Sequence, residues 1–155
     1  MQHKNLRFLA YGILGVIVSL AIFSFGTPAG ADNFQIYLDK KLVVQEFVHL
    51  SKKPQTINLQ AAHQNSQIDV YYNHCGELGK SRTIVLKDNQ NRVLREFHFK
   101  DGNKFMACKV SAFVDFKKKD AIPAIHLYYA AKQSPEPRLL ANIMVNASDK
   151  ALAGK

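Results

Sequence analysis

The chain has 155 residues, 47% of them hydrophobic, and carries a formal net charge of +9 at pH 7. This length suits one domain with its own buried core, which excludes a small scaffold that depends on many disulfide bonds. The basic charge attracts anionic surfaces in general, so by itself it specifies neither a partner nor a reaction.

Residues 1–31 have the pattern of a secretory signal peptide. Lys4 and Arg7 precede an uncharged apolar run at 8–25, and Ala29-Gly30-Ala31 places small residues where a signal peptidase cleaves. Cleavage before Asp32 is therefore expected. The alternative is an uncleaved anchor, because the run approaches the roughly 18–20 residues that span a bilayer. Both interpretations export the rest of the chain to the periplasm or beyond, with membrane contact only through an uncleaved N-terminus.

The rest of the chain, residues 32–146, shows mainly the two-residue alternation of β-strands. About eight strands separated by turn signals predict an all-β fold, an antiparallel β-sandwich of about seven to nine strands in one domain. The small, polar tail at 147–155 is expected to fray. In chain order the strands are expected at 34–39, 41–50, 55–60, 66–72, 82–87, 92–99, 124–132 and 138–145.

Two polar links predict hairpins. The first is Asp88-Asn89-Gln90-Asn91, and the second is Ser134-Pro135-Glu136-Pro137. Asp, Asn and Ser favour turns because their side chains bond to nearby backbone. Proline has no N–H to donate to a sheet ladder, so the second link is expected to be a turn or loop.

The segment 105–116 fits either a strand or a short helix. As a strand it places Met106, Cys108 and Val110 on one face, whereas as a helix it places Phe105, Cys108 and Ala112 on one stripe. Periodicity does not separate these alternatives in so short a run, so both remain open.

The stretch 72–82, YNHCGELGKSR, resembles the end of a phosphate-binding loop only superficially. The working motif needs a glycine five residues before the Gly-Lys-Ser, and His74 occupies that position. It also needs a helix to follow, whereas the next residues read as a strand. A turn is therefore the expected role of Gly76 and Gly79.

The cysteines Cys75 and Cys108 are the only two in the chain, and export favours a disulfide between them. Closing a loop of about 34 residues would stabilise the fold by roughly 3–4 kcal/mol. A catalytic Cys75 is a weaker alternative, because the neighbouring His74 would point to the opposite face of a strand. Its base would then have to be another histidine, namely His49, His63, His98 or His126.

Metal binding is a further alternative, since thiolate, imidazole and thioether groups suit copper or zinc. If any residues bind metal, they are His74, Cys75, Met106 and Cys108. None of them has the close spacing of a known ligand pair, so neither a metal nor another cofactor is expected.

A candidate binding face follows from the alternation within strands. If the buried positions are Ile, Leu and Val, the outward side chains include Tyr37, Tyr71, His126 and Tyr128. Should these strands be neighbours, the four side chains would form one face with aromatic rings and polar tips. Such a face suits stacking on a sugar or packing against a partner.

The runs YNHCG, GKSRTIVLKD and LREFHF resemble small exported proteins of Gram-negative bacteria that have no assigned activity. Those proteins share a His-Cys-Gly, a Gly-Lys and an Arg before a strand, followed by a hairpin. The resemblance extends from Phe34 to Val145. It implies export and a β-sandwich, and it implies no catalytic residues.

Together these patterns predict an exported, disulfide-stabilised binding module rather than an enzyme, because no paired carboxylates or serine nucleophile motif stand out. One alternative is a periplasmic metal or thiol-redox protein that uses Cys75 and Cys108. A weaker alternative is a secreted inhibitor with a basic surface. The expected partner is a cell-envelope protein or an anionic surface. Specific nucleic-acid binding is not expected, because the lysines are scattered along the chain.

Overall fold

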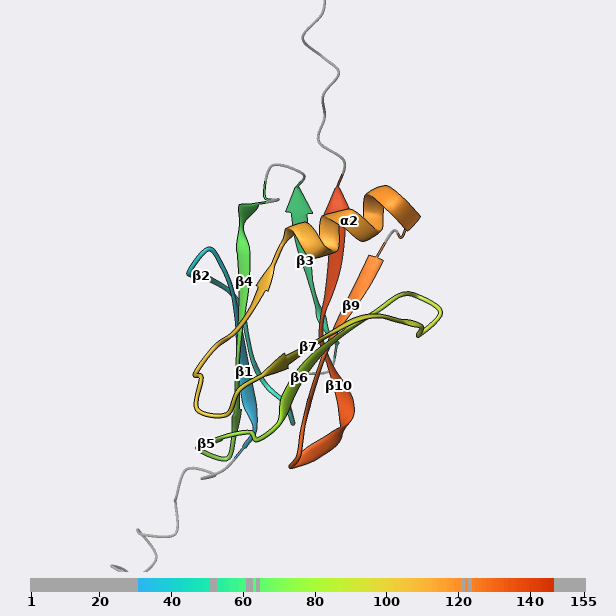
Figure 1. Cartoon of the computed structure of the whole chain (residues 1–155). Coiled ribbons are helices and arrows are strands. Elements are labelled where there is room, and N and C mark those ends of the chain that lie inside the picture. Colours follow the sequence, from blue (N-terminus) through green and yellow to red (C-terminus); the bar gives the residue numbers. More distant parts are fainter. Residues whose placement is uncertain are drawn as a thin grey trace, which may run out of the picture.

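The computed structural model describes residues 31–50, 53–60, 63, 65–120, 122 and 124–146. In this part of the chain, ten strands form two sheets that face each other, and one helix lies across an end of the pair (Figure 1). The predicted all-β sandwich is therefore confirmed. The predicted signal peptide, apart from Ala31, and the predicted tail lie outside the described residues.

Sheet A contains the first strands of the chain in the order β2-β1-β4. Strands β5 and β8 both pair with the far edge of β4, β5 near its C-terminal end and β8 near its N-terminal end. All of these pairs are antiparallel. The bounds are β1 Asn33–Leu38, β2 Lys41–Phe47, β4 Gln67–His74, β5 Glu77–Leu78 and β8 Met106–Lys109.

Sheet B has the order β3-β10-β9-β6-β7. Its pairs are antiparallel except for β3 and β10, which run parallel. Because β3 belongs to sheet B while β2 and β4 belong to sheet A, the chain changes sheets twice within its first four strands. The bounds are β3 Gln55–Gln60, β6 Arg82–Lys87, β7 Val93–Phe99, β9 Ala124–Ala131 and β10 Ser134–Asn146.

The core lies between the two sheets and follows the alternation of the sequence. Every second residue of β9 is buried, including Ile125, Leu127 and Tyr129. Strand β4 contributes Ile68 and Tyr72 from the opposite sheet. Burying such side chains stabilises the fold by about 1.5–3 kcal/mol each, which is the main force holding the sheets together.

The ambiguous segment 105–116 contains both of its predicted structures. It begins with β8 and continues as α2, Ser111–Asp120. The change occurs at Val110, whose N–H bonds to the carbonyl of Ser66 while its own carbonyl accepts from Phe113 and Val114. Helix α2 buries Phe113 and Val114, and it covers the end of the sandwich that is uppermost in Figure 1.

The two predicted hairpins both form, but the second turn lies earlier than expected. Strand β9 turns into β10 at residues 132–133, and the link 134–137 is the irregular start of β10. The register shifts between Ser134 and Arg138, so Pro135 and Pro137 fall outside the paired positions. This irregular pairing is how a strand accommodates residues without an N–H.

The first hairpin depends on the buried side chain of Asp88. Its Oδ1 accepts from the backbone N–H groups of Gln90 and Arg92, and its Oδ2 accepts from Arg92 Nε at 2.7 Å. Burial alone would raise the pKa of Asp88, but the hydrogen bonds from Arg92 and Gln90 outweigh it and hold the pKa below the ordinary 3.8. The ionised carboxylate therefore organises the turn.

We expect Asp88→Asn to lower the urea concentration at the midpoint of unfolding at pH 7. A group whose folded-state pKa is depressed stabilises the fold above its unfolded pKa and loses that effect as the pH falls through its folded pKa. The difference in urea midpoint between wild type and Asp88→Asn should therefore become smaller as the pH is lowered toward about 3. Gln90→Ala, which keeps the backbone donor, is the matched control. An equal deficit at both pH values would contradict a role for the charge.

Candidate functional site

A hydrogen-bonded cluster closes the end of the sandwich opposite α2, where β4 and β5 meet (Figure 1). Its centre is His74, whose Nδ1 lies 3.1 Å from Asp32 Oδ2 and whose Nε2 lies 3.0 Å from the hydroxyl of Tyr129. The hydroxyl of Tyr72 donates to the same oxygen of Asp32 at 3.0 Å. We call Asp32, Tyr72, His74 and Tyr129 the His74 cluster.

Local pairing explains how the His74 cluster assembles. Asn33 pairs with Asn73, which places Asp32 opposite His74 at the end of sheet A. The carbonyl of Asp32 accepts the N–H of Val48, which holds its backbone against the end of β2. Tyr129 comes from β9 of sheet B. The imidazole of His74 therefore bridges the two sheets.

The two tyrosines of the cluster stack on each other. The ring centroids of Tyr72 and Tyr129 are 4.1 Å apart with an angle of 11° between the planes. Burial raises the pKa of Tyr129 to about 12 and raises the pKa of Tyr72 as well. Both phenols therefore stay protonated. Tyr72 donates to Asp32, and the hydroxyl of Tyr129 shares a hydrogen bond with His74 Nε2.

The order carboxylate, imidazole, hydroxyl is that of a hydrolytic triad, but the surroundings differ. A triad needs a nucleophile that substrate can reach and that the imidazole can deprotonate. The hydroxyl here belongs to Tyr129, which is fully buried and has a raised pKa. The arrangement therefore fits a structural bridge between the sheets.

The glycine of the predicted turn packs directly on the His74 cluster. A Cβ added at Gly79 would overlap the Tyr129 hydroxyl and would lie 3.1 Å from His74 Nε2. The turn itself is made by Cys75 and Gly76, which have φ values of 50° and 98°. Close packing and a tight turn therefore account for both glycines, in agreement with the rejection of a phosphate loop.

A buried arginine beside this cluster was missed by sequence reasoning. Arg82 is fully buried, and its Nη2 donates to the carbonyl of Lys100 at 2.9 Å. Its Nε and Nη1 have no hydrogen-bond partner among the described residues. The alternation of β6 contained the signal, because Arg82, Ile84 and Leu86 share the buried face.

The predicted disulfide between Cys75 and Cys108 is wrong, because the two residues lie near opposite ends of β4. Cys108 pairs with Ile68, and Cys75 is seven positions further along the same chain. At about 3.3 Å per residue, the position of Cys75 along β4 is roughly 23 Å from the position opposite Cys108. A disulfide needs Cα atoms within about 7 Å. The two cysteines are accordingly not bonded to each other.

Neither thiol is favourably placed for redox chemistry. Burial raises the pKa of Cys108 to about 12, with a further contribution from Asp69. Desolvation and a hydrogen bond to Asp32, at 3.5 Å from Sγ, raise the pKa of Cys75. A raised pKa lowers the thiolate fraction on which nucleophilic attack and metal binding depend.

The four residues considered as metal ligands fall into two separate pairs. Met106 and Cys108 are buried on β8, whereas His74 and Cys75 lie at the other end of β4. Within the described residues, no group of three or more His, Cys, Asp or Glu side chains is arranged to hold a metal ion. The set proposed from the sequence therefore does not come together.

The predicted four-residue binding face is also wrong, because its members lie on opposite sides of the sandwich. Tyr37 and Tyr71 point outward from sheet A, whereas His126 and Tyr128 point outward from sheet B. His126 bonds to Asn142 and Asn89, and the ring of Tyr128 lies under the ammonium of Lys87 at 4.8 Å. Alternation gave the correct side of each strand but not the sheet to which it belongs.

On sheet A, a third ring joins the two tyrosines. Phe105, from the loop before β8, lies 5.6 Å from Tyr37 and 6.0 Å from Tyr71, measured between ring centroids. It is 40% exposed. The ammonium of Lys104 lies 5.4 Å from the Tyr71 ring centre and 5.5 Å from that of Phe105. We call Tyr37, Tyr71 and Phe105 the aromatic surface of sheet A.

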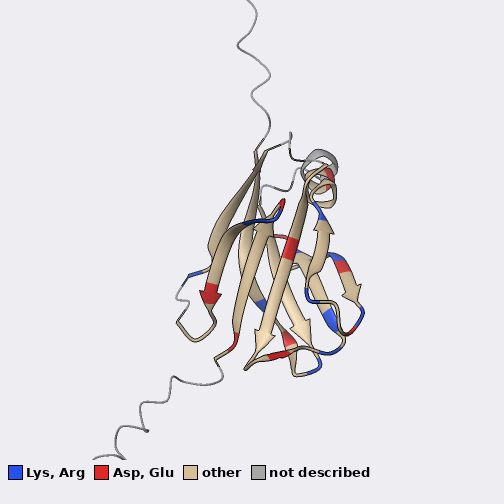
Figure 2. Ribbon diagram, turned by 90° about the vertical axis from the view of Figure 1, so that its left-hand side faces the viewer, with Lys and Arg blue, Asp and Glu red and all other residues tan. Residues whose placement is uncertain are grey.

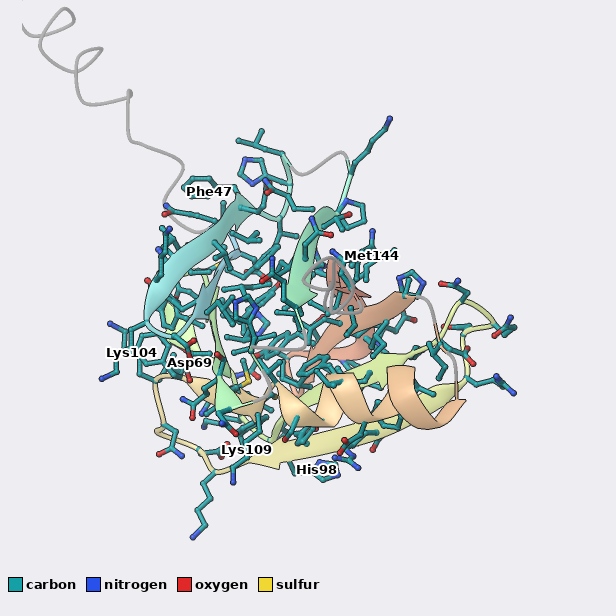
Figure 3. All side chains as sticks on the ribbon, turned by 90° about the horizontal axis from the view of Figure 1, so that it is seen from above. Phe47, Asp69, His98, Lys104, Lys109 and Met144 are labelled. Atoms are coloured by element: carbon teal, nitrogen blue, oxygen red, sulfur yellow. The ribbon has the colours of Figure 1, made fainter. Side chains whose placement is uncertain are left out.

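Charged side chains are sparse around this surface. Strand β1 has none, and Asp69 is the one acidic residue of β4. Figure 2 shows this side of the molecule with mostly uncharged strands. Figure 3 labels Asp69 and Lys104 beside sheet A; Asp69 lies opposite Tyr37 in the sheet, and the ammonium of Lys104 lies over the rings. Their opposite charges leave the surface nearly neutral.

Comparisons with known proteins add little to this geometry. No family model and no curated protein matches the chain. One similar solved structure is the extracellular domain of a putative one-component system from B. thetaiotaomicron, with 11% sequence identity and a TM-score of 0.43. The match covers 79% of this chain and 16% of that much longer one. Among the described residues, no helix is long and apolar enough to cross a membrane.

We expect Gly79→Ala to lower the free energy of unfolding by about 1–3 kcal/mol, the range found for overpacked sites. The added methyl group would push the Tyr129 hydroxyl away from His74. Urea unfolding measures the change. The exposed Lys80→Ala, next in the chain, should change stability by less than about 0.5 kcal/mol. Equal stability of the two variants would show that the His74 cluster tolerates a side chain at position 79.

We expect Cys75→Ser to change the free energy of unfolding by less than about 1 kcal/mol, because serine can also donate to Asp32. The unreduced protein should also keep the mass expected without a bond between its two cysteines. A loss of roughly 3–4 kcal/mol on substitution, together with a mass lower by two hydrogens, would instead support the disulfide.

Proposed function

We propose that this chain is an exported binding module without catalytic activity, and that it binds through the aromatic surface of sheet A. The observation that carries the proposal is the cluster of three rings outside the core, at Tyr37, Tyr71 and Phe105. Aromatic rings in a neutral surrounding are typical of the centre of a binding surface, where charged residues are depleted. Export rests on the N-terminal sequence.

The outer face of sheet B offers a useful contrast. Of the residues predicted for a binding face, His126 is held there by Asn142 and Asn89, and Tyr128 lies under Lys87 much as Tyr71 lies under Lys104. Exposed apolar side chains are also unevenly distributed. Phe47 and Leu42 belong to β2 of sheet A and are 45% and 44% exposed, and Phe105 precedes β8, whereas on sheet B Val93 of β7 is 54% exposed. These differences favour sheet A as the binding side.

The geometry supports a binding role over the alternatives. The His74 cluster places its hydroxyl in the core, and the raised pKa values of both cysteines oppose a thiolate mechanism. The copper, zinc or thiol-redox alternative therefore loses the close grouping of ligands that it needs. No observation favours the inhibitor alternative over a general binding role.

Site-specific photo-crosslinking in living cells tests the proposal. We expect Phe105→p-benzoylphenylalanine to give crosslinked species of higher mass after irradiation, because benzophenone inserts into C–H bonds of any molecule bound at the aromatic surface. The matched control is the same replacement at Tyr128, on the outer face of sheet B, which should give none. Equal crosslinking from both positions, or none from position 105, would refute this surface as the binding site.

A further inference from the structure

The ligand class of the aromatic surface of sheet A can be inferred from the side chains between and beside its rings. This inference rests on the function proposed above. The pairing of β2, β1 and β4 sets these neighbours in rows across the sheet. One row reads Gln45, Gln35, Tyr71, and the next reads Phe47, Asn33, Asn73. The row through Tyr37 reads Leu42, Tyr37, Asp69, so uncharged amides lie beside the aromatic rings and one carboxylate borders them.

The amides beside the rings are suited to hydroxyl groups. Each Asn or Gln side chain offers two N–H donors and a carbonyl acceptor, so it can serve a hydroxyl in either role. Gln35 accepts the hydroxyl proton of Tyr37 at its Oε1, at 2.6 Å, which orients its NH₂ group. Gln45 is exposed beside it on the neighbouring strand. A ligand with many hydroxyls can be matched here without leaving polar groups unpaired.

The rings supply the complementary apolar part. Phe105 meets Tyr37 nearly edge-on, at an angle of 88°, and meets Tyr71 at 57°. Such a group presents apolar ring surface next to the amides of β1 and β2. Lys104 now lies over two of these rings as an exposed cation. Its long side chain can move aside and still donate to a hydroxyl.

Charge argues for a neutral ligand. The chain as a whole carries +9, yet β1 is uncharged, and the two charges that border the rings, Asp69 opposite Tyr37 and Lys104 over Tyr71, have opposite signs. An anionic ligand would be drawn instead to the scattered lysines elsewhere on the chain. A bound ligand at this face therefore gains its affinity from stacking and hydrogen bonds rather than from ion pairs.

We propose that the aromatic surface of sheet A binds an uncharged carbohydrate. The C–H face of a pyranose ring packs on Tyr71 and Phe105, and its hydroxyl groups bond to the amides of Gln35 and Gln45. Pyranoses combine an apolar face with a rim of hydroxyls, which is the pattern that these rows of rings and amides match.

The test uses the purified exported protein, immobilised as wild type, Tyr71→Ser, Phe105→Ser and Tyr128→Ser. Each column receives an envelope extract from the bacterium that produces the protein, and is washed with about 0.5 M NaCl to remove charge-driven binding. Tyr128 is the matched control, because it is also an outward tyrosine under a lysine but lies on sheet B. Retained material is treated with protease or periodate and analysed for monosaccharides.

We expect the wild-type and Tyr128→Ser columns to retain neutral sugars that survive protease and are destroyed by periodate. Tyr71→Ser and Phe105→Ser should bind the released oligosaccharide at least about tenfold more weakly, as for central interface residues. If the retained material is removed by protease or released by the salt wash, the carbohydrate hypothesis would be wrong, while the aromatic surface of sheet A would remain the binding site. Equal retention by all four columns, or none by the wild type, would overturn the surface itself.

Discussion

The bridge from Asp32 through His74 to Tyr129 is the interaction that holds the two sheets together at the end of the sandwich opposite α2. Two sheets in contact through apolar side chains alone can slide with little change in buried area, because apolar burial has no direction. Hydrogen bonds at 3.1 Å and 3.0 Å on the two nitrogens of one imidazole are directional, so they set the register between sheet A and sheet B. The packing of Gly79 against both partners depends on that register.

The sheet-to-sheet register also decides what each outer face can do. Strand β4 supplies Tyr72 and His74 to the interior and, on alternate positions, Tyr71 and Asn73 to the outside. The same short segment therefore both locks the fold and presents the ring at the centre of the proposed binding surface. A function placed on this strand gains rigidity from the bridge beneath it, which reduces the entropy lost on binding.

The sequence predicted the fold class well, because alternation in strands such as β9 is a local property that survives folding. It also placed the first turn, since the side chain of Asp88 acts within its own hairpin. It failed where the answer depended on how strands are arranged. Nothing local indicates that β9 lies in the opposite sheet from β4, so the four-residue face was wrongly joined. The disulfide failed for the same reason, and Phe105 was missed because loop residues have no periodicity.

Asp32 has two roles, and together they matter for protein maturation. It is the residue that the predicted leader cleavage would leave at the N-terminus, and its carboxylate holds both Tyr72 and His74. If cleavage occurs at the predicted position, the exact position of the cut would therefore affect the stability of the fold. A peptidase that cut one residue too late would release a chain lacking its bridge, so heterogeneity at the new N-terminus would become heterogeneity in how firmly the two sheets are joined.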